Sequence, residues 1–394
     1  MKKPFHNETY SNILYQRMQL INPGIAGMEP FEFAYALENL VPADGWETVV
    51  PMDQAAIERM INDINFYQGI QLRPKAGNKP VMDAHVLSLA QHLFAGLVHG
   101  VYEAEWIQRH FTFDIRGFYF QHKTQYYSDA IVQRMGGSPY RQFEPKQRQF
   151  ATAQTIGYKD FMAANAEIDA CFIDLVFALV QTLGEPIVVA IAGQTAAGKT
   201  EITERLCSRF VASGKKVTTI EIDNFFLDRD YREAMGIDSL GMEALHFKAF
   251  KTCLRDIRQG KKVTIPQYNF IDAISSHDLD GQLKTGRQPL VVEPADIIFM
   301  EGNFPFLYPD IADLIGIKVM YITDDDVRMK RKWKRDMDYR KKYELMYFLN
   351  RYFREQFIMA ELVYRPQMAL CDLIVDTSAA ELWATAGIQQ LLEG

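Results

Sequence analysis

The sequence has few cysteines, no long apolar run and no apolar leader at its N-terminus, and each absence argues against a class of protein. Its 4 cysteines include no C-x-x-C pair, so neither a disulfide framework nor a zinc site is expected. The residues after Met1 are mostly polar and lack the apolar segment of a secretory signal. The longest apolar runs, such as 171–180, are far shorter than the ~20 residues that span a bilayer. We therefore expect a soluble, cytoplasmic protein with no membrane partner.

The sequence also lacks an excess of basic residues. It has 43 lysines and arginines against 50 acidic residues, which gives a net charge of −7. Nucleic-acid-binding proteins usually carry a basic domain or face, so we expect no nucleic-acid partner. Hydrophobic residues make up 48% of the chain, which is enough for well-packed cores. A length of 394 residues exceeds what one core usually supports and predicts two domains.

The pattern of apolar residues changes near residue 184. Before it the chain is predicted to be mostly helical, with long helices over 81–106 and 165–183 and a loop over 134–149. After it, apolar runs of strand length alternate with helical stretches, which is typical of a parallel sheet covered by helices on both faces. The predicted strands are 187–192, 216–222, 296–300, 317–322 and 373–375, and a helix is predicted over 200–211. We expect a mostly α-helical domain over 1–183 and a doubly wound α/β domain over 184–394.

A phosphate-binding loop joins the first predicted strand to its helix. Residues 193–200 read G-Q-T-A-A-G-K-T and fit the pattern G-x-x-x-x-G-K-[ST]. Glycines let backbone N–H groups turn toward phosphate oxygens, and the helix N-terminus adds a partial positive charge. Lys199 is expected to reach the β- and γ-phosphates of ATP, and Thr200 to offer its hydroxyl to Mg²⁺. The nucleotide-binding residues are thus expected to be Gly193, Gln194, Thr195, Ala196, Ala197, Gly198, Lys199 and Thr200.

Two acidic residues end predicted strands, at the edge where ligands bind in open α/β sheets. Glu301 ends the run D-I-I-F-M-E, which resembles a Walker B element with a carboxylate near Mg²⁺. Asp223 ends V-T-T-I-E-I-D, where a base could accept the proton of a substrate hydroxyl. Each could instead be an ordinary solvated acid, but the nearby phosphate-binding loop favours a functional role.

Five markers in this order resemble the uridine kinase/phosphoribulokinase family, over residues 187–375. They are the phosphate-binding loop, I-D-N-F-F at 222–226, G-K-K-V-T-I-P-Q-Y-N-F at 260–270, E-G at 301–302 and D-V-R-M-K-R-K-W-K-R-D at 326–336. The resemblance implies a P-loop kinase domain with Asp223 as general base. It also implies that Thr200, Glu301 and Asp223 are the Mg²⁺ partners.

The basic stretch near 328–342 has two interpretations. By the resemblance, Arg335 and Arg340 (with Lys342 as a further candidate) belong to a mobile lid that contacts the phosphates. By composition alone, the stretch is a solvated charged helix, and several of its lysines fit that description. It lacks the interleaved aromatics of a nucleic-acid surface.

The sequence departs from uridine kinases where they hold the nucleoside. Their F-D-H-P-D-A-F-D segment corresponds to S-L-G-M-E-A-L-H at 239–246, which lacks both flanking acids. The position of their base-reading histidine is Ala273, and His277 lies four residues further on. The candidate acceptor-binding residues are Phe226, His246, Tyr268 and Phe270. We therefore expect an acceptor other than uridine.

Two other clusters in the N-terminal half are weaker candidates. His85, His92 and His99 recur every seven residues, which on a helix separates neighbours by ~10 Å, too far for one metal ion. Packing is the better interpretation. The aromatic-rich stretch over 111–127 is expected to form a core or an inter-domain surface, with a ligand pocket as the alternative.

The sequence as a whole predicts an ATP- and Mg²⁺-dependent kinase that phosphorylates a hydroxyl of a small molecule. A sugar, a polyol, a nucleoside-like compound and a hydroxy acid all remain candidate acceptors. The alternative is a non-catalytic ATP sensor or scaffold, which would not need a base at Asp223. Whether the protein forms a homo-oligomer stays open.

Overall fold

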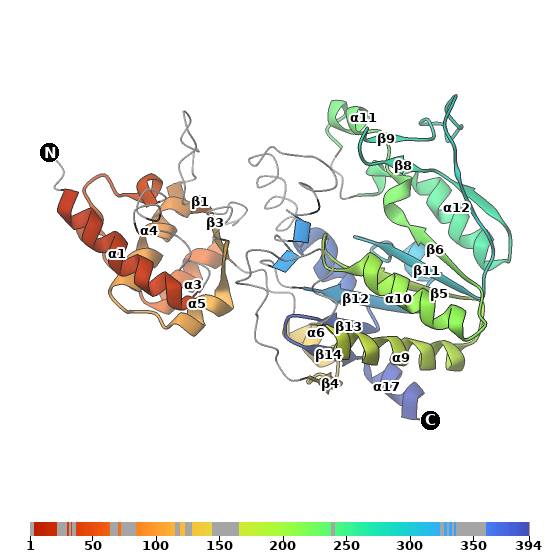
Figure 1. Ribbon diagram of the computed structural model, residues 1–394, viewed down its shortest axis with the longest axis horizontal. Coiled ribbons are helices and arrows are strands. Elements are labelled where there is room, and N and C mark those ends of the chain that lie inside the picture. The colour runs from red at the N-terminus through yellow and green to blue at the C-terminus, as the bar shows by residue number, and fades with distance from the viewer. Residues whose placement is uncertain are drawn as a thin grey trace. The chain divides into compact units, whose positions relative to one another are not determined.

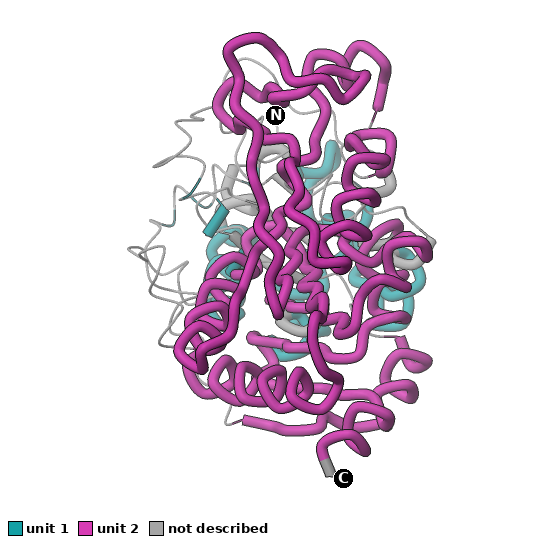
Figure 2. Tube along the Cα trace, turned by 90° about the vertical axis from the view of Figure 1, so that its right-hand side faces the viewer, with its two compact units in different colours: residues 1–125, 147–158, 325–358 teal, residues 126–146, 159–324, 359–394 magenta. Residues whose placement is uncertain are grey.

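The computed structural model describes residues 4–21, 30, 33, 37–63, 70–71, 84–114, 119–122, 128–143, 165–237, 241–323, 327–328, 331–332, 335 and 360–393. The chain forms two compact units (Figure 2): Met1–Gln125 with Gln147–Tyr158 and Asp325–Ile358, and Tyr126–Lys146 with Lys159–Asp324 and Met359–Gly394. Among the described residues, no helix is both long and apolar enough to cross a membrane.

The first unit is mostly helical. Its described helices are α1 (Pro4–Ile21), α3 (Gln54–Asp63), α4 (Ala84–Val98) and α5 (Ala104–His110), with short 3₁₀ turns η2 (Leu37–Leu40) and η3 (Trp46–Thr48). Strands β1 (Ile70–Gln71), β2 (Phe111–Asp114) and β3 (Tyr119–His122) form an antiparallel sheet in the order β1-β3-β2. The helices bury one cluster of apolar side chains, in which the rings of Tyr10 and Trp46 stack at 4.3 Å.

The single helix expected over 81–106 is wrong, because the structure has two helices there. Gly100 adopts a left-handed φ of +68° just after α4, and the N–H of Val101 donates to the carbonyl of Gly96 at 2.8 Å. Glycine reaches this conformation at little cost and commonly ends helices. The chain therefore leaves the helix before α5 begins.

The second unit is built on a seven-stranded sheet in the order β4-β14-β13-β12-β5-β11-β6. The five strands β6 (Val217–Glu221), β11 (Ile297–Gly302), β5 (Ile187–Ala192), β12 (Ile317–Ile322) and β13 (Leu373–Asp376) are parallel. Strand β14 (Glu381–Ala384) and then β4 (Arg141–Gln142) extend the edge in antiparallel pairings. All five strands predicted from the sequence are confirmed, whereas β14 and β4 were not predicted.

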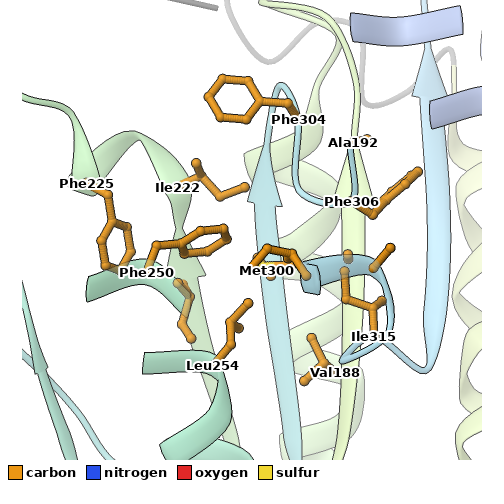
Figure 3. Close-up of a cluster of buried hydrophobic side chains, with 14 of the residues drawn as sticks. Val188, Ala192, Ile222, Phe225, Phe250, Leu254, Met300, Phe304, Phe306 and Ile315 are labelled. Atoms are coloured by element: carbon orange, nitrogen blue, oxygen red, sulfur yellow. The ribbon is translucent and has the colours of Figure 1, made fainter. Parts of the chain in front are cut away.

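Helices cover both faces of this sheet (Figure 1). Side chains at alternate strand positions, such as Val189 and Phe299, pack under α9 (Ala166–Leu183), α10 (Lys199–Ala212) and α17 (Ala386–Glu393). The intervening positions face α12 (Phe247–Arg258), α13 (Pro309–Ala312), α16 (Arg365–Met368), the π-helical turn η7 (Ala360–Tyr364) and α6 (Asp129–Arg134). Figure 3 shows this second core, with Phe250 from α12 beside Met300 on β11. The α/β doubly wound fold is thus present.

The units divide the chain differently from the boundary expected near residue 184. Helices α6 and α9 and strand β4 precede that residue yet belong to the second unit. In α9, Asp169 is buried and accepts hydrogen bonds from Arg205 at 2.6 Å and from the Tyr321 hydroxyl at 2.7 Å. Because α9 covers one face of the sheet, it packs as part of the α/β unit. Sequence periodicity shows that a helix has an apolar stripe but not which sheet the stripe covers.

Between β6 and β11 the chain forms a set of short elements. They are η4 (Ile222–Phe225), α11 (Arg229–Ala234), η5 (Met242–Ala244), the strands β8 (Tyr268–Asn269) and β9 (Ile274–Ser275) of one hairpin, and the paired strands β7 (Val263–Ile265) and β10 (Leu290–Val292). Figure 1 shows α11 beside β8 and β9. These pieces follow the strand ends that carry the candidate site.

Candidate active site

The phosphate-binding loop has the geometry that its motif predicts. It follows β5 directly and leads into α10, whose N-terminal cap is Gly198 with a left-handed φ of 106°. A Cβ at Gly193 would lie 2.4 Å from the carbonyl oxygen of Tyr321, so a side chain there would collide with the backbone at the end of β12. Both glycines are thus required by the path of the chain.

Lys199 holds its ammonium group inside this loop. Its Nζ donates hydrogen bonds to the carbonyl oxygens of Gly193 at 2.8 Å and Gln194 at 2.9 Å, and it lies 3.5 Å from the Asn303 side-chain oxygen. The positive charge therefore stands where the loop's backbone curves around it. Asn303 was not predicted, although its place two residues after the strand-end Glu301 could have suggested it.

Glu301 lies beside the loop, on strand β11, which pairs with β5. Its Oε1 accepts a hydrogen bond from the Thr200 hydroxyl at 2.8 Å, while its Oε2 is buried without a hydrogen-bond partner among the described residues. Burial raises the pKa of Glu301 to about 7, against the lowering effects of Lys199 and Thr200. The charges of Glu221 and Asp223 raise this pKa further. The strand ends thus collect three carboxylates that act on one another electrostatically.

Asp223 lies in η4, directly after β6, and is half-buried. Its charge raises the pKa of both Glu301 and Glu221, so the two acids singled out from the sequence do lie near one another. Glu221 was not predicted, although it ends the strand two residues before Asp223. A carboxylate at Asp223 can accept a proton, and its neighbours increase the local negative charge.

The donor set fits Mg²⁺, a hard cation that prefers oxygen ligands. Thr200 supplies a hydroxyl, Glu301 and Asp223 supply carboxylates, and the buried Glu301 Oε2 has no partner among the described residues. Within the described part of the chain no group of three or more His, Cys, Asp or Glu residues could hold a metal by itself. That is compatible with Mg²⁺, which is usually bound through one or two carboxylates and the substrate's phosphates.

The candidate acceptor residues form an aromatic cluster next to the segment that carries Asp223. The Tyr268 ring meets Phe226 edge-on at 5.7 Å and Phe270 at 5.2 Å between centroids. The backbone N–H of Tyr268 donates to the side-chain oxygen of Asn224 at 3.3 Å. Tyr268 therefore contacts two of the other predicted acceptor residues beside η4.

His246, the fourth predicted acceptor residue, is buried in a polar network of its own. Its Nε2 lies 3.2 Å from the Ser275 hydroxyl, and burial lowers the pKa of its ring. Asp228 accepts from the backbone N–H of Ser275 at 2.7 Å and pairs with Lys284 at 2.7 Å. Neither Asp228 nor Lys284 was predicted, because they are 56 residues apart and belong to no shared motif.

The predicted lid residues and the histidines of the first unit have different outcomes. Arg340 and Lys342 lie outside the described residues, and Arg335 belongs to the first compact unit, so a role of these residues at the phosphates stays a prediction. In the first unit, the ring Nδ1 of His92 hydrogen-bonds the carbonyl oxygen of Val50 at 2.9 Å, which fits the packing role expected from its spacing.

A parallel sheet whose strand ends carry a glycine-rich loop, a lysine and clustered carboxylates is typical of P-loop nucleotide-binding proteins. The family model of the phosphoribulokinase/uridine kinase family matches residues 188–382. The chain is 31% identical to a uridine kinase of Streptococcus gordonii over 39% of its length and 70% of that protein. It is 27% identical to a uridine kinase of Lactobacillus helveticus over 49% of its length and 87% of that protein. The chain belongs to the phosphoribulokinase/uridine kinase family of small-molecule kinases.

Other similarities are more distant or cover less of the related protein. The match to the uridine kinase-like protein 4 of Arabidopsis thaliana is 30% identical and spans only 30% of that protein. A structure described as a fructose transport system kinase from Silicibacter covers 55% of this chain and 97% of its own, at 17% identity and a TM-score of 0.39. A D-glycerate 3-kinase structure from Cryptococcus neoformans has the same coverage, at 14% identity and a TM-score of 0.38.

Proposed function

We propose that the protein transfers the γ-phosphate of ATP to a hydroxyl group of a small molecule. The observation that carries this proposal is that two groups of residues, a first half-site for the nucleotide and a second half-site with the candidate base, lie together at the strand ends. Lys199 and the Thr200–Glu301 pair stand in the phosphate-binding loop, and the Asp223 carboxylate lies close enough to raise the pKa of Glu301. A nucleotide sensor needs only the first half-site.

On the donor side, the loop's backbone and Lys199 would hold the β- and γ-phosphates, and the N-terminus of α10 would add its partial positive charge. The Lys199 ammonium already lies within the loop, 2.8 Å from the Gly193 carbonyl. Thr200 and Glu301, with Asp223 as a further candidate, would hold Mg²⁺. The bound ion would neutralise charge on the phosphate oxygens during transfer.

On the acceptor side, Asp223 would take the proton of the attacking hydroxyl. The acceptor oxygen forms a bond to the γ-phosphorus while the bond from that phosphorus to the bridging oxygen breaks, and ADP leaves with the electron pair. The proton moves to the Asp223 carboxylate.

The acceptor is proposed to be something other than uridine. At the position of the family's base-reading histidine, Ala273 is buried and its carbonyl oxygen accepts from the N–H of Arg229 at 3.0 Å. His277, four residues further on, has its Nδ1 2.8 Å from the Ser276 hydroxyl and its ring 6.4 Å from that of His246. These contacts are made within the protein. We propose that the aromatic cluster recognises a molecule other than uridine. A cytoplasmic location and a homo-oligomer stay predictions.

The test is ADP release by the purified protein with ATP, Mg²⁺ and a panel of sugars, polyols, nucleosides and hydroxy acids. We expect at least one acceptor to stimulate ADP release, and Asp223→Asn to lower turnover by about 10³-fold, within the range for loss of a general base. ATP binding should persist in this variant. The matched control is Asp230→Asn, which removes an exposed carboxylate at the start of α11 and should leave turnover unchanged.

Two results would count against this function. Near-wild-type turnover in Asp223→Asn would reject that residue as the base. Tight ATP binding without stimulation by any acceptor would favour the ATP-sensing alternative.

A further inference from the structure

Arg232 is a buried cation at the aromatic cluster. It lies on α11 with 8% of its surface exposed. Its Nε donates to the carbonyl of Leu227 at 3.1 Å, and its Nη2 donates to the Tyr268 hydroxyl at 3.2 Å. The guanidinium carbon stands 5.2 Å from the centre of the Phe226 ring. Arg232 therefore contacts two of the residues expected to bind the acceptor.

The charge of Arg232 is not matched by a carboxylate among the described residues. Asp228, the N-terminal cap of α11, pairs with Lys284 through both of its oxygens, at 2.8 and 2.7 Å. Arginine stays protonated and has five N–H donors, of which the contacts above use two. A buried charge is costly unless it is paired, so this site favours a negatively charged partner.

Tyr268 connects the segment that carries Asp223 to Arg232. The backbone end of Tyr268 is hydrogen-bonded to Asn224, next to Asp223, and its hydroxyl end contacts Arg232. One tyrosine side chain thus separates the segment of the base from the guanidinium. An acceptor that reaches from Asp223 to Arg232 would therefore need to span about the length of one tyrosine side chain.

We infer that the acceptor is an anionic hydroxy compound whose carboxylate or phosphate ion-pairs with Arg232. This inference rests on the proposed kinase function and narrows its substrate class. The planar guanidinium suits both anions, since each can accept two parallel hydrogen bonds from it. Neutral nucleosides, sugars and polyols would leave the buried charge unpaired and would bind less tightly.

The test compares acceptors that differ only in the anionic group. Glycerate is paired with glycerol and ribose 5-phosphate with ribose, so the two arms distinguish a carboxylate from a phosphate. We expect one anionic member to exceed its neutral partner by tenfold or more in kcat/KM. Arg232→Gln should lower kcat/KM for that anion by about 10- to 100-fold, as expected for loss of a charge-assisted hydrogen bond. The KM for ATP should not change.

Two further variants separate recognition from folding. Arg232→Lys keeps the positive charge and should therefore recover part of the activity with the anionic acceptor. If Arg232 only stabilised the fold, its substitution would lower activity equally with anionic and neutral acceptors. Arg258→Gln makes the same charge change at an exposed position on α12 and should leave the anion preference intact. Thermal shift with each compound, in the presence of ADP, measures binding without turnover.

The outcomes distinguish this inference from the proposed function. If neutral acceptors are preferred, or if Arg232→Gln affects neutral and anionic compounds equally, the inference is overturned while the kinase function stands. If nothing turns over but an anion stabilises the wild type and not Arg232→Gln, the kinase function fails and the anion site is supported. If no anion turns over or binds, the inference is rejected.

Discussion

The two sides of the candidate site are built in different ways. The donor side comes from consecutive residues, the loop over 193–200, and from Glu301 at the end of the neighbouring strand. The acceptor side gathers side chains from η4, α11 and the β8–β9 hairpin. Each of these elements is short. Under the proposed function, the donor side would bind largely through backbone groups and the acceptor side through side chains.

Under the proposed function, this difference would separate phosphoryl transfer from substrate choice. The donor loop is supported by the central sheet, since Gly193 packs against the backbone of Tyr321 and the Tyr321 hydroxyl donates to Asp169 of α9. The acceptor side depends on a few side-chain contacts, such as those of Tyr268 with Asn224 and Arg232. Substitutions there can change the acceptor while the sheet and the loop remain intact.

Among the three changes considered next, the largest effect is expected from Lys199→Ala, on the donor side. Loss of the ammonium from the loop removes charge stabilisation of the transferring phosphoryl group. We expect kcat to fall by 10²-fold or more, as for other preorganised electrostatic groups, with weaker ATP binding. Steady-state kinetics and ATP titration would measure both.

The matched control is Lys262→Ala, at a lysine paired with Glu293 on the surface. It should not change the rate. Unchanged kinetics in Lys199→Ala would contradict the assignment of the whole donor side.

An intermediate effect is expected in the pH dependence of stability, through Glu301. Its pKa is about 7 in the folded protein against 4.5 for an unperturbed glutamate, so between these values the folded state holds a proton that the unfolded state has lost. The free energy of unfolding should therefore fall as pH rises through this window, by on the order of 3 kcal/mol for the full shift. Urea unfolding of the nucleotide-free and metal-free protein at pH 5 and 7.5 measures the change.

Glu301→Gln should flatten this pH dependence, because the amide does not titrate. Glu293→Gln, at an exposed carboxylate, is the control and should retain it. The same slope in wild type and Glu301→Gln would show that other groups cause the pH dependence.

The smallest effect is expected on the acceptor side, from Tyr268→Phe. This change removes the hydroxyl that accepts from Arg232 but keeps the ring packed against Phe226. Since one hydrogen bond typically contributes about 1 kcal/mol, the KM for the acceptor should rise by roughly fivefold while kcat and the KM for ATP change little. Kinetics with the acceptor found in the panel would test this split.

Tyr308→Phe provides the comparison, because it removes a hydroxyl that accepts from the N–H of Met242 outside the aromatic cluster. A loss of kcat without a change in acceptor KM in Tyr268→Phe would contradict the division between the two sides.

Much of the α/β unit and the donor side could be predicted from the sequence. Strands β5, β11, β12 and β13 are rich in apolar residues because both faces of their sheet are covered by helices. The edge strand β6 reads V-T-T-I-E and is less buried. The loop's chemistry depends on glycines and a lysine at fixed spacing, and such local geometry is encoded in consecutive residues. Gly100, by contrast, ended a helix that apolar spacing had extended to residue 106.

The sequence by itself determined the kinase fold, the phosphate-binding loop and the placement of Asp223 and Glu301 at strand ends, because each follows from a local pattern. Only the tertiary structure decided that α9 packs in the α/β unit and that Glu301 is buried enough to raise its pKa to about 7. It also brought Arg232 to Tyr268, 36 residues away. Burial and charge pairing depend on side chains that meet across the fold, and no periodicity in the chain records which of them do.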